Sequence, residues 1–437
     1  MRLTWVQPED LLPHQLVQGR AEGVDVADVE DRWRRAGGTA DAPVSGASDK
    51  PATAELRELA RALLAELDSR TPAWTPPVIP VLDKLTGSAD LSERVLNAWL
   101  GRAAGNLLGK PVEKIPREGI REILEISGQW PLTQYITAVG VPDEVQAKWP
   151  WNRRSKPTSL REVIDGMPED DDLNFAILAL QLVERHGSAL TTEDVAQAWL
   201  GELPAGRVFT AERVAYRNLL EGVDPLQAAL VRNPFREWIG AQIRTDAYGW
   251  TRPGDRMAAA QLALADARLS HTGSGVDGAL WVAAMSAAAM VLDDPREVAL
   301  AGLEVVDADG EIARAVRFGL SLADAPLDEA LDALHSAYGH LHWVHSVNNS
   351  ALTAYALTAP DFATGIGRAV MGGWDTDSAG ATVGAVLGAV LGVPAEWSRP
   401  LDNRIATSLP GMNQVAIDEL AARTVAAATS DEGERRG

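Results

Sequence analysis

The chain has 437 residues, a formal net charge of −21 and no cysteine, and 46% of its residues are hydrophobic. Its length allows a large core and roughly two to three domains, and its composition is typical of a soluble globular protein. The acidic balance argues against nucleic acid and anionic membranes as partners. The lack of cysteine excludes disulfides and thiolate chemistry and fits a cytoplasmic location.

The first 85 residues predict an N-terminal helical appendage with a flexible linker. A short amphipathic pattern ends with residues 26–35, and a segment rich in Gly, Ala, Ser and Pro follows at 37–53. A helix is expected at about 54–69, before an extended, proline-rich connection at 71–80. The N-terminus has no apolar signal-peptide core.

A main domain is expected at 86–428, followed by a disordered tail at 429–437. Its first helix begins after Asp90, a candidate N-cap with Glu93 three positions later, and apolar residues then recur at every fourth position. The further expected helices are rich in Ala and Leu and cover about 173–186, 192–202, 210–222, 256–268, 276–292, 295–305, 310–321, 326–337, 349–358, 361–371, 378–392 and 412–428. Because no run of alternating strand residues stands out, we predict an all-α, orthogonally packed multi-helix bundle.

Two of the expected helices carry glycine at every fourth position. The rows are Gly101, Gly105 and Gly109 in one helix and Gly380, Gly384, Gly388 and Gly392 in the other. Such a row costs about 1 kcal/mol per glycine relative to alanine but lets a neighbouring backbone approach closely. We therefore predict that these helices form the centre of the bundle and bring Glu113 close to Asp375 and Asp377. Coincidence in a chain rich in Ala and Gly is the alternative.

The stretch 378–395 has no charged residue and is the nearest approach to a membrane span. It is rich in glycine, is interrupted by Pro394 and follows two aspartates. We expect a buried core helix there rather than a transmembrane helix.

Two acidic segments, far apart in the chain, are the candidate functional motifs. In the first, Asp170, Asp171 and Asp172 directly precede the apolar stretch 173–180; the second is Gly-Gly-Trp-Asp-Thr-Asp-Ser at 372–378. Helix capping is the alternative for each segment, although one acidic side chain suffices for a cap. Crowded carboxylates repel unless a cation lies among them, and ligand sets made only of oxygen suit Mg²⁺ or Mn²⁺. The two segments therefore predict a two-metal hydrolytic site.

These motifs resemble those of the ADP-ribosylglycohydrolase family, which includes the hydrolase acting on dinitrogenase reductase. Segment 372–378 is similar to the family's Gly-Gly-Asp-Thr-Asp-Thr signature, 105–113 (Gly-Asn-Leu-Leu-Gly-Lys-Pro-Val-Glu) to its Gly-Asp-Ala-x-Gly-x-x-x-Glu motif, and 170–172 to its Thr-Asp-Asp. The resemblance covers roughly residues 90–425 and implies the all-α fold of that family with two divalent cations, Mg²⁺ or Mn²⁺. It assigns catalytic roles to Glu113 and Asp171, and metal binding to Asp170, Asp171, Asp172, Asp375, Asp377 and Ser378.

The same resemblance assigns substrate-binding roles to Asn106, Arg244, Gly249, His271, Gly373 and Trp374. Positions that depart from the family pattern are Asn106 (usually Asp), Asp170, Leu173 and Ser378 (each usually Thr) and Ile239 (often Asn). Because Asp170 and Ser378 still offer oxygen, the expected metal binding is retained. Ile239 and the tryptophans at 130, 149 and 151 leave the substrate open.

The implied activity is hydrolysis of a glycosidic bond to ribose, in an ADP-ribosylated protein or in a small ADP-ribosyl or ribosyl conjugate. Two dications, typically ~3.5–4 Å apart, orient ribose hydroxyls and activate water, and a carboxylate base such as Glu113 suits an oxocarbenium-like transition state. A non-catalytic ligand-binding or structural member of the same fold is one alternative, and a metal phosphohydrolase is another.

Four histidines lie between positions 335 and 345, which raises the possibility of zinc. The His-Glu-x-x-His spacing of a zinc hydrolase is missing, so we do not expect a zinc site there. His345, Asn348 and Asn349 are instead expected to support the ligand pocket.

Overall fold

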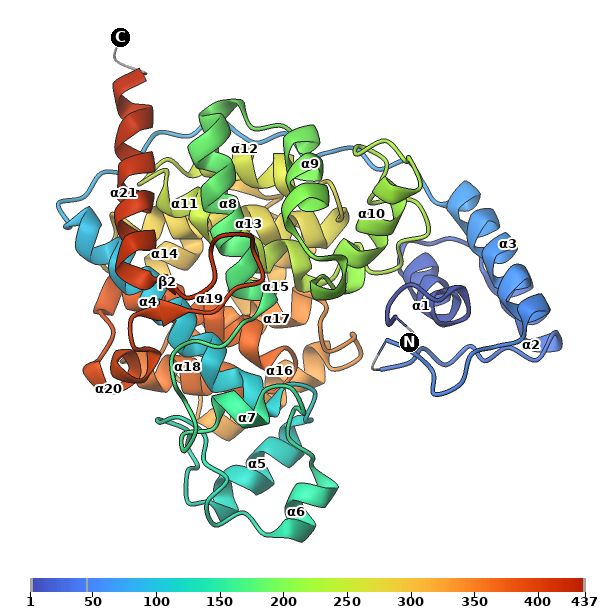
Figure 1. The fold of residues 1–437 in the computed structure, drawn as a ribbon, viewed down its shortest axis with the longest axis horizontal. Coiled ribbons are helices and arrows are strands. Elements are labelled where there is room, and N and C mark those ends of the chain that lie inside the picture. Colours follow the sequence, from blue (N-terminus) through green and yellow to red (C-terminus); the bar gives the residue numbers. More distant parts are fainter. Residues whose placement is uncertain (1–2, 45, 435–437) are drawn as a thin grey trace.

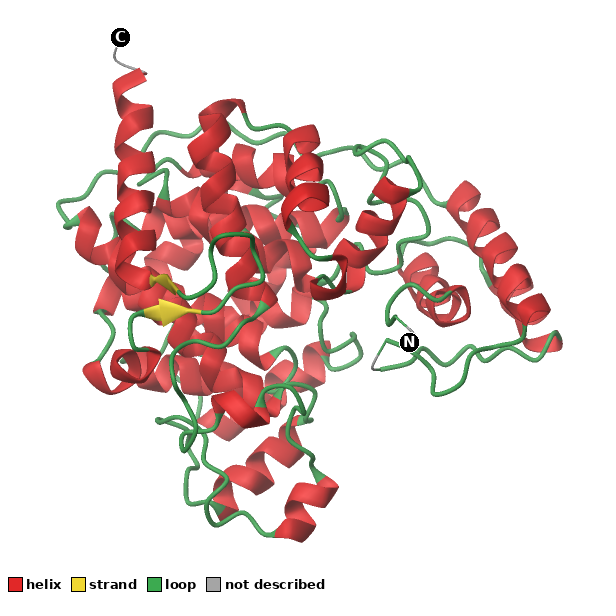
Figure 2. Ribbon diagram, in the orientation of Figure 1, coloured by secondary structure: helices red, strands yellow, loops and turns green. Residues whose placement is uncertain are grey.

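The computed structural model describes residues 3–44 and 46–434, and the regular structure of these residues is almost entirely helical (Figures 1 and 2). The exception is an antiparallel pair of two-residue strands, β1 (Arg404–Ile405) and β2 (Val415–Ala416). The predicted all-α fold is therefore confirmed. The strands lie outside that prediction because two residues are too few to show an alternating pattern.

The helices follow one another along the chain with short connections in most places. Those of the first 90 residues are α1 (Pro8–Ala21), α2 (Ala27–Arg35) and α3 (Ala54–Arg70). Those of the main body are α4 (Leu91–Gly109), α5 (Arg117–Ile126), α6 (Asp143–Lys148), α7 (Lys156–Ser159), α8 (Asp171–His186), α9 (Thr192–Glu202), α10 (Thr210–Leu220), α11 (Asp246–Trp250), α12 (Arg256–Ala267), α13 (Gly273–Ala289), α14 (Pro295–Gly302), α15 (Glu311–Ser321), α16 (Leu327–Tyr338), α17 (Ser346–Ala356), α18 (Phe362–Met371), α19 (Thr376–Leu391), α20 (Ala395–Ser398) and α21 (Ile417–Glu434). The sequence pattern predicts most of the long helices to within a few residues, although α21 starts and ends about five residues later than the predicted 412–428. Helices α1, α5, α6, α7, α11 and α20 are not predicted.

Helices α4 and α19 cross with their backbones in direct contact. A Cβ atom placed on Gly105 would lie 1.9 Å from the carbonyl oxygen of Gly380, and one placed on Gly101 would lie 2.0 Å from that of Gly384. No side chain larger than hydrogen fits these distances, so both glycine rows are needed where the helices meet. The predicted glycine-mediated crossing is confirmed, except at Gly392, which ends α19 with a φ of +80° and open space around it.

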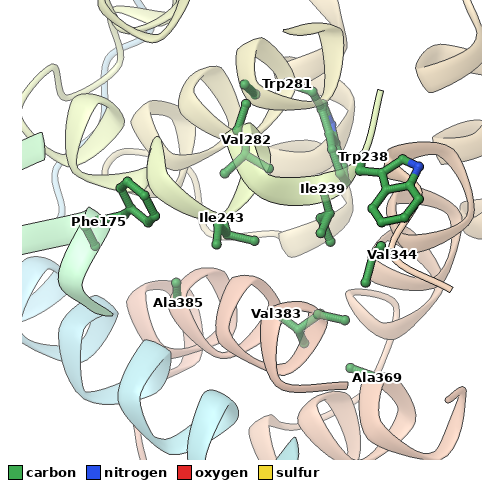
Figure 3. Packing of buried hydrophobic residues seen from close by; sticks show 14 of the residues in the cluster. Phe175, Trp238, Ile239, Ile243, Trp281, Val282, Val344, Ala369, Val383 and Ala385 are labelled. Carbon is green, nitrogen blue, oxygen red and sulfur yellow. The ribbon is translucent and has the colours of Figure 1, made fainter. Parts of the chain in front are cut away.

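A continuous hydrophobic core surrounds this crossing. In the part that Figure 3 shows, Ile239 and Ile243 of the 3-10 turn η4 (Ile239–Arg244) lie between Val282 of α13 and Val383 of α19. Nearly all residues of α19 are buried, as expected for a core helix. Within the described residues, no helix is both long and apolar enough to cross a membrane.

The N-terminal helices α1 to α3 lie at one side of the bundle, on the right of Figure 1. Trp5 packs edge-on against Phe235 and Trp238 of the main body, with ring centroids 5.3 and 5.7 Å apart, and Glu22 forms an ion pair with Arg236. Residues 71–90 contain no helix and run along the bundle to α4. The N-terminal region is thus anchored to the main body by both apolar and charged contacts.

At the other end of the chain, α21 continues to Glu434. The predicted tail begins at 429, so its first residues are helical, while residues 435–437 lie outside the described part.

Candidate metal centre

The glycine crossing brings three distant segments to one end of the bundle. Helix α4 continues through the 3-10 turn η1 (Lys110–Val112) to Glu113, α8 begins after Asp170, and α19 begins after Asp375. The Thr376 hydroxyl donates a hydrogen bond of 2.9 Å to the Gly109 carbonyl, which ties the start of α19 to the end of α4. The predicted catalytic and metal-binding residues therefore line one cleft, as expected from the two glycine rows.

This cleft has a volume of about 1310 Å³. Asp170, Asp171, Asp172, Asp375 and Asp377 line it and form what we call its acidic floor. Its walls carry aromatic and basic side chains from several parts of the chain, namely Trp5, Trp149, Trp151, Phe209, Trp238, Trp343, Lys114, Arg153, Arg154 and Arg207. The N-terminal region contributes Trp5, and the segment around α6 and α7 contributes Trp149 and Trp151. The walls therefore depend on regions outside the acidic motifs.

Three carboxylates from the two acidic segments converge on the floor of the cleft. Asp170, Asp172 and Asp377 each offer an oxygen, and these oxygens lie within 4.8 Å of one another. Ser378 donates a hydrogen bond of 3.3 Å to Oδ2 of Asp172. Oδ1 of Asp172 and Oδ1 of Asp377 are buried and accept no hydrogen bond from the described residues, although Asp172 Oδ1 lies 3.6 Å from the Arg102 guanidinium. Buried oxygens of this kind are costly without a partner, and a hard divalent cation fits them.

Burial is the main reason why most of these carboxyl groups resist ionisation. Burial raises the pKa of Asp171, Asp172 and Asp375 well above the ordinary range, and repulsion from neighbouring carboxylates adds to it. Burial also raises the pKa of Asp377 to about 7, with further contributions from Glu113 and Asp170. A cation among these groups favours their ionised forms, so the electrostatics of the floor suit a metal ion.

Asp170 is different because a lysine faces it. Burial disfavours its ionised form, but the charge and hydrogen bond of Lys110 outweigh burial and lower its pKa. The Lys110 ammonium contacts Oδ2 of Asp170 and lies 3.3 Å from the Glu169 carbonyl oxygen. Oδ1 of Asp170 accepts hydrogen bonds from the Asn106 amide at 3.0 Å and from the Asp172 backbone N–H at 3.1 Å. The sequence pattern assigns no role to Lys110, although this residue lies inside motif 105–113.

Glu113 stands at the margin of the acidic floor with both carboxylate oxygens engaged. The Lys114 ammonium lies 3.1 Å from Oε1, and the Asn152 side-chain amide donates to Oε2. The Glu113 side chain keeps 19% of its surface exposed, so it is both oriented and accessible from the cleft. Lys114 and Asn152 are further residues that the sequence pattern does not indicate.

Gly373 and Trp374 shape the second acidic segment but do not line the cleft. Both have a positive φ, of +73° and +62°, and the Trp374 ring stacks on His335 with centroids 4.4 Å apart. Asn349 accepts a hydrogen bond of 3.2 Å from the Asp375 backbone N–H. Asn349, which the sequence leads us to expect in support of the ligand pocket, therefore supports this segment, and the predicted substrate contacts of Gly373 and Trp374 remain predictions.

Three other predicted substrate-binding residues lie away from the cleft. Arg244 is fully buried and forms ion pairs with Asp266 and, at 2.7 Å, with Glu212. His271 is also fully buried, with Nδ1 2.8 Å from the Ser270 hydroxyl. A Cβ atom on Gly249 would lie 2.4 Å from the Ala283 carbonyl oxygen, so this glycine allows α11 to pack on α13. Internal pairing and packing thus engage Arg244 and Gly249, whereas Nε2 of His271 is buried without a hydrogen-bond partner among the described residues. Of the predicted polar contacts, only Asn106 reaches the acidic floor.

The histidines of 335–345 do not gather around a common point. His342 stacks on Trp238 at 4.1 Å, and His345 caps α17 by accepting a hydrogen bond from the Val347 backbone N–H at 3.3 Å. Within residues 3–44 and 46–434, the triangle of Asp170, Asp172 and Asp377 is the one group of three or more potential ligands close enough to share an ion.

The chain is similar to known proteins in sequence and in structure. The model of the ADP-ribosylglycohydrolase family matches residues 87–434. A protein of Archaeoglobus fulgidus described as uncharacterized is 26% identical over 318 residues, which are 72% of this chain and 93% of that protein. A solved chain of an ADP-ribosylglycohydrolase-related protein complex is similar with a TM-score of 0.49 and 21% identity, over 78% of this chain and 99% of its own length. The family match contains the whole acidic floor and leaves α1 to α3 outside.

Proposed function

The chain belongs to the ADP-ribosylglycohydrolase family, and we propose that it hydrolyses a glycosidic bond to ribose. The substrate is an ADP-ribosylated protein or a small ADP-ribosyl or ribosyl conjugate. The observation that carries this proposal is the convergence of Asp172 and Asp377 with Glu113 at the floor of one cleft.

The acidic floor would hold the divalent metal of this reaction, Mg²⁺ or Mn²⁺. The cleft-lining residues that offer side-chain oxygens are Asp170, Asp171, Asp172, Asp375, Asp377 and Ser378. When bound, such a metal supplies positive charge that orients ribose hydroxyls and makes water a better nucleophile near neutral pH. The Arg102 guanidinium donates a hydrogen bond of 3.0 Å to the backbone carbonyl of Asp172 and so holds this residue in position.

Glu113 is the proposed general base, with Asp171 as a second cleft-lining carboxylate beside it. A base must be held within reach of the proton that it takes up, and Lys114 and Asn152 hold the two oxygens of Glu113. The attacked ribose carbon gains positive charge as the glycosidic bond breaks. The negative charge of the floor carboxylates stabilises this positive charge.

The walls suit the remaining parts of an ADP-ribose-type substrate. Trp343, which is only partly buried, offers an aromatic face on which a purine stacks, and arginines bind phosphate through paired N–H donors. Arg153, Arg154 and Arg207 lie on these walls and reverse locally the repulsion that the net charge of −21 exerts on an anion. The leaving group is arginine, serine or a small molecule, and the substrates of the assay below distinguish these three.

Release of ADP-ribose or ribose from ADP-ribosyl-arginine, ADP-ribosyl-serine and simple ribosides, with Mg²⁺ or Mn²⁺ added, tests the proposal. We expect Glu113→Gln to lower kcat by about 10²–10⁴-fold, the usual contribution of a general base, without loss of metal binding. The matched control is Glu118→Gln, since Glu118 is exposed on α5 and does not line the cleft.

Other outcomes point to the alternative functions. Release of inorganic phosphate instead of ribose or ADP-ribose would indicate a phosphohydrolase. Tight binding of ADP-ribose and metal with no turnover of any conjugate would indicate a non-catalytic member of the family.

A further inference from the structure

The hydrogen bonds of Asp170 leave little of this carboxylate for a metal. Its Oδ1 accepts from the Asn106 amide and from the Asp172 backbone N–H, at 3.0 and 3.1 Å, and its Oδ2 accepts from the Lys110 ammonium. A carboxylate oxygen has two lone pairs, so both lone pairs of Oδ1 are engaged and one remains on Oδ2. That remaining lone pair lies beside an ammonium group, which repels a dication. Asp170 is therefore the counter-ion of Lys110 rather than a free metal ligand.

The Lys110 ammonium is also held firmly in the floor. Only 6% of the Lys110 surface is exposed, and 8% of that of Asp170. The ammonium donates to two oxygens, the Glu169 carbonyl and the Asp170 carboxylate. A buried charge without its partner is unfavourable, so separating this pair to admit a second ion at Asp170 is unfavourable as well.

Two buried carboxylate oxygens of the floor have no hydrogen-bond partner among the described residues, and Asp171 and Asp375 also line the cleft. Oδ1 of Asp172 and Oδ1 of Asp377 accept no hydrogen bond from the described residues, and Ser378 lies against Asp172. These atoms offer a place for one dication. Asp170 stands where the family motif has Thr, and the positive charge of Lys110 balances its negative charge within the floor.

We propose that the Lys110 ammonium takes the place of one of the two divalent cations, so that this centre binds a single ion through Asp172 and Asp377. This inference rests on the proposed metal-dependent function and refines it. Lys110 then acts as a fixed, built-in cation that holds Asp170 and the start of α8 in position.

The number of bound ions tests the proposal directly. Metal-free protein is equilibrated with Mn²⁺, the bound metal is counted after dialysis, and the electron paramagnetic resonance spectrum is recorded. An isolated Mn²⁺ gives a resolved hyperfine pattern, whereas two neighbouring ions give a broadened, exchange-coupled spectrum. For the wild type we expect one ion per chain and the spectrum of an isolated ion.

Two variants free the second position. Lys110→Met removes the ammonium, and Lys110→Met combined with Asp170→Thr does so without changing the net charge of the floor. We expect both to bind twice as much Mn²⁺ as the wild type and to show exchange coupling. The double variant keeps the test valid if Lys110→Met alone fails to fold because Asp170 is left buried without its partner. Lys148→Met is the control, since Lys148 is exposed, pairs with Glu122 and does not line the cleft, and it should still bind one ion.

Each other result overturns the inference. Two coupled ions in the wild type would show that Lys110 does not replace a metal, and the proposed hydrolase would stand. A single ion in both the folded double variant and the wild type would show that Lys110 does not control the number of ions. No bound ion in any of the proteins would overturn the metal centre itself, and this inference with it.

Discussion

Replacing Gly105 with alanine tests whether direct backbone contact between α4 and α19 builds the site. The new Cβ would lie 1.9 Å from the Gly380 carbonyl oxygen, and ordinary contacts begin near 3.4 Å, so the two helices must separate by about 1.5 Å. The obstacle is backbone, which no side-chain rotation can relieve. The hydrogen bond of 2.9 Å between Thr376 and Gly109 also joins these helices and would be stretched by the same movement.

The expected free-energy change combines two opposite effects. Overpacking in a close-packed interior costs about 1–3 kcal/mol and sometimes more, and the upper part of that range applies because helix backbones must move. Alanine recovers about 1 kcal/mol through its higher helix propensity. We therefore expect Gly105→Ala to lower the free energy of unfolding by about 2 kcal/mol, and to weaken Mn²⁺ binding because Asp377 moves with α19.

Urea unfolding followed by tryptophan fluorescence measures this change. The control is Gly201→Ala in α9, where the structure places nothing within 4 Å of the new Cβ and the propensity gain of up to about 1 kcal/mol stands alone. The two alanines should thus shift the urea midpoint in opposite directions. If Gly105→Ala were as stable as Gly201→Ala, the close crossing of α4 and α19 would be refuted.

Three further predictions address charge, burial and the cleft wall. Burial, followed by the charge of Glu22, raises the pKa of Glu237 from 4.5 to about 7. A raised folded-state pKa gives stability that is present below pH 4.5 and lost as pH rises through 7, so the free energy of unfolding of the wild type should fall by about 3 kcal/mol over this window. In urea titrations at several pH values, Glu237→Gln should show a smaller fall. An unchanged pH dependence in this variant would contradict the burial of the carboxyl group. Arg102→Met leaves Asp246, 2.7 Å away and fully buried, without its partner, so we expect about 3–5 kcal/mol of destabilisation in urea unfolding and recovery of most of it on adding Asp246→Leu; wild-type stability in the single variant would be inconsistent with the pair. Trp5→Ala removes an aromatic contact worth about 0.5–1.5 kcal/mol together with part of the cleft wall, so calorimetry should show about tenfold weaker binding of ADP-ribose and unchanged Mn²⁺ affinity. ADP-ribose affinity equal to that of the wild type would show that the N-terminal region does not contribute to ligand binding.

Features that depend on local pattern are the ones that the sequence predicts well. The glycine rows at 101–109 and 380–392 predicted a close helix crossing, with coincidence as the alternative, and the structure shows the close approach at all of these glycines except Gly392. The acidic residues at 170–172 and 375–377 precede long apolar helices and share the floor once those helices cross. The prediction of a family and an all-α fold followed from these local motifs and is confirmed.

Features that depend on partners far along the chain are the ones that the sequence does not reveal. Arg244 reads as a substrate contact until the structure shows Glu212 and Asp266 on either side of its guanidinium. Lys110 occupies a position of its motif at which any residue is allowed, and its partner Asp170 lies in another segment. In both cases the role follows from which carboxylate reaches the cation in three dimensions, and no local pattern encodes that.

The shared metal site of the two acidic segments is tested most directly by calorimetric titration of Mn²⁺ into Asp172→Asn, Asp377→Asn and the double variant. Both substitutions keep side-chain size and remove one charge. We expect each single variant to bind Mn²⁺ at least about tenfold more weakly than the wild type, and the double variant to lose little more than the weaker single variant, because residues that hold one ion are coupled. Wild-type affinity in either single variant, or losses that simply add, would show that Asp172 and Asp377 do not bind the same ion.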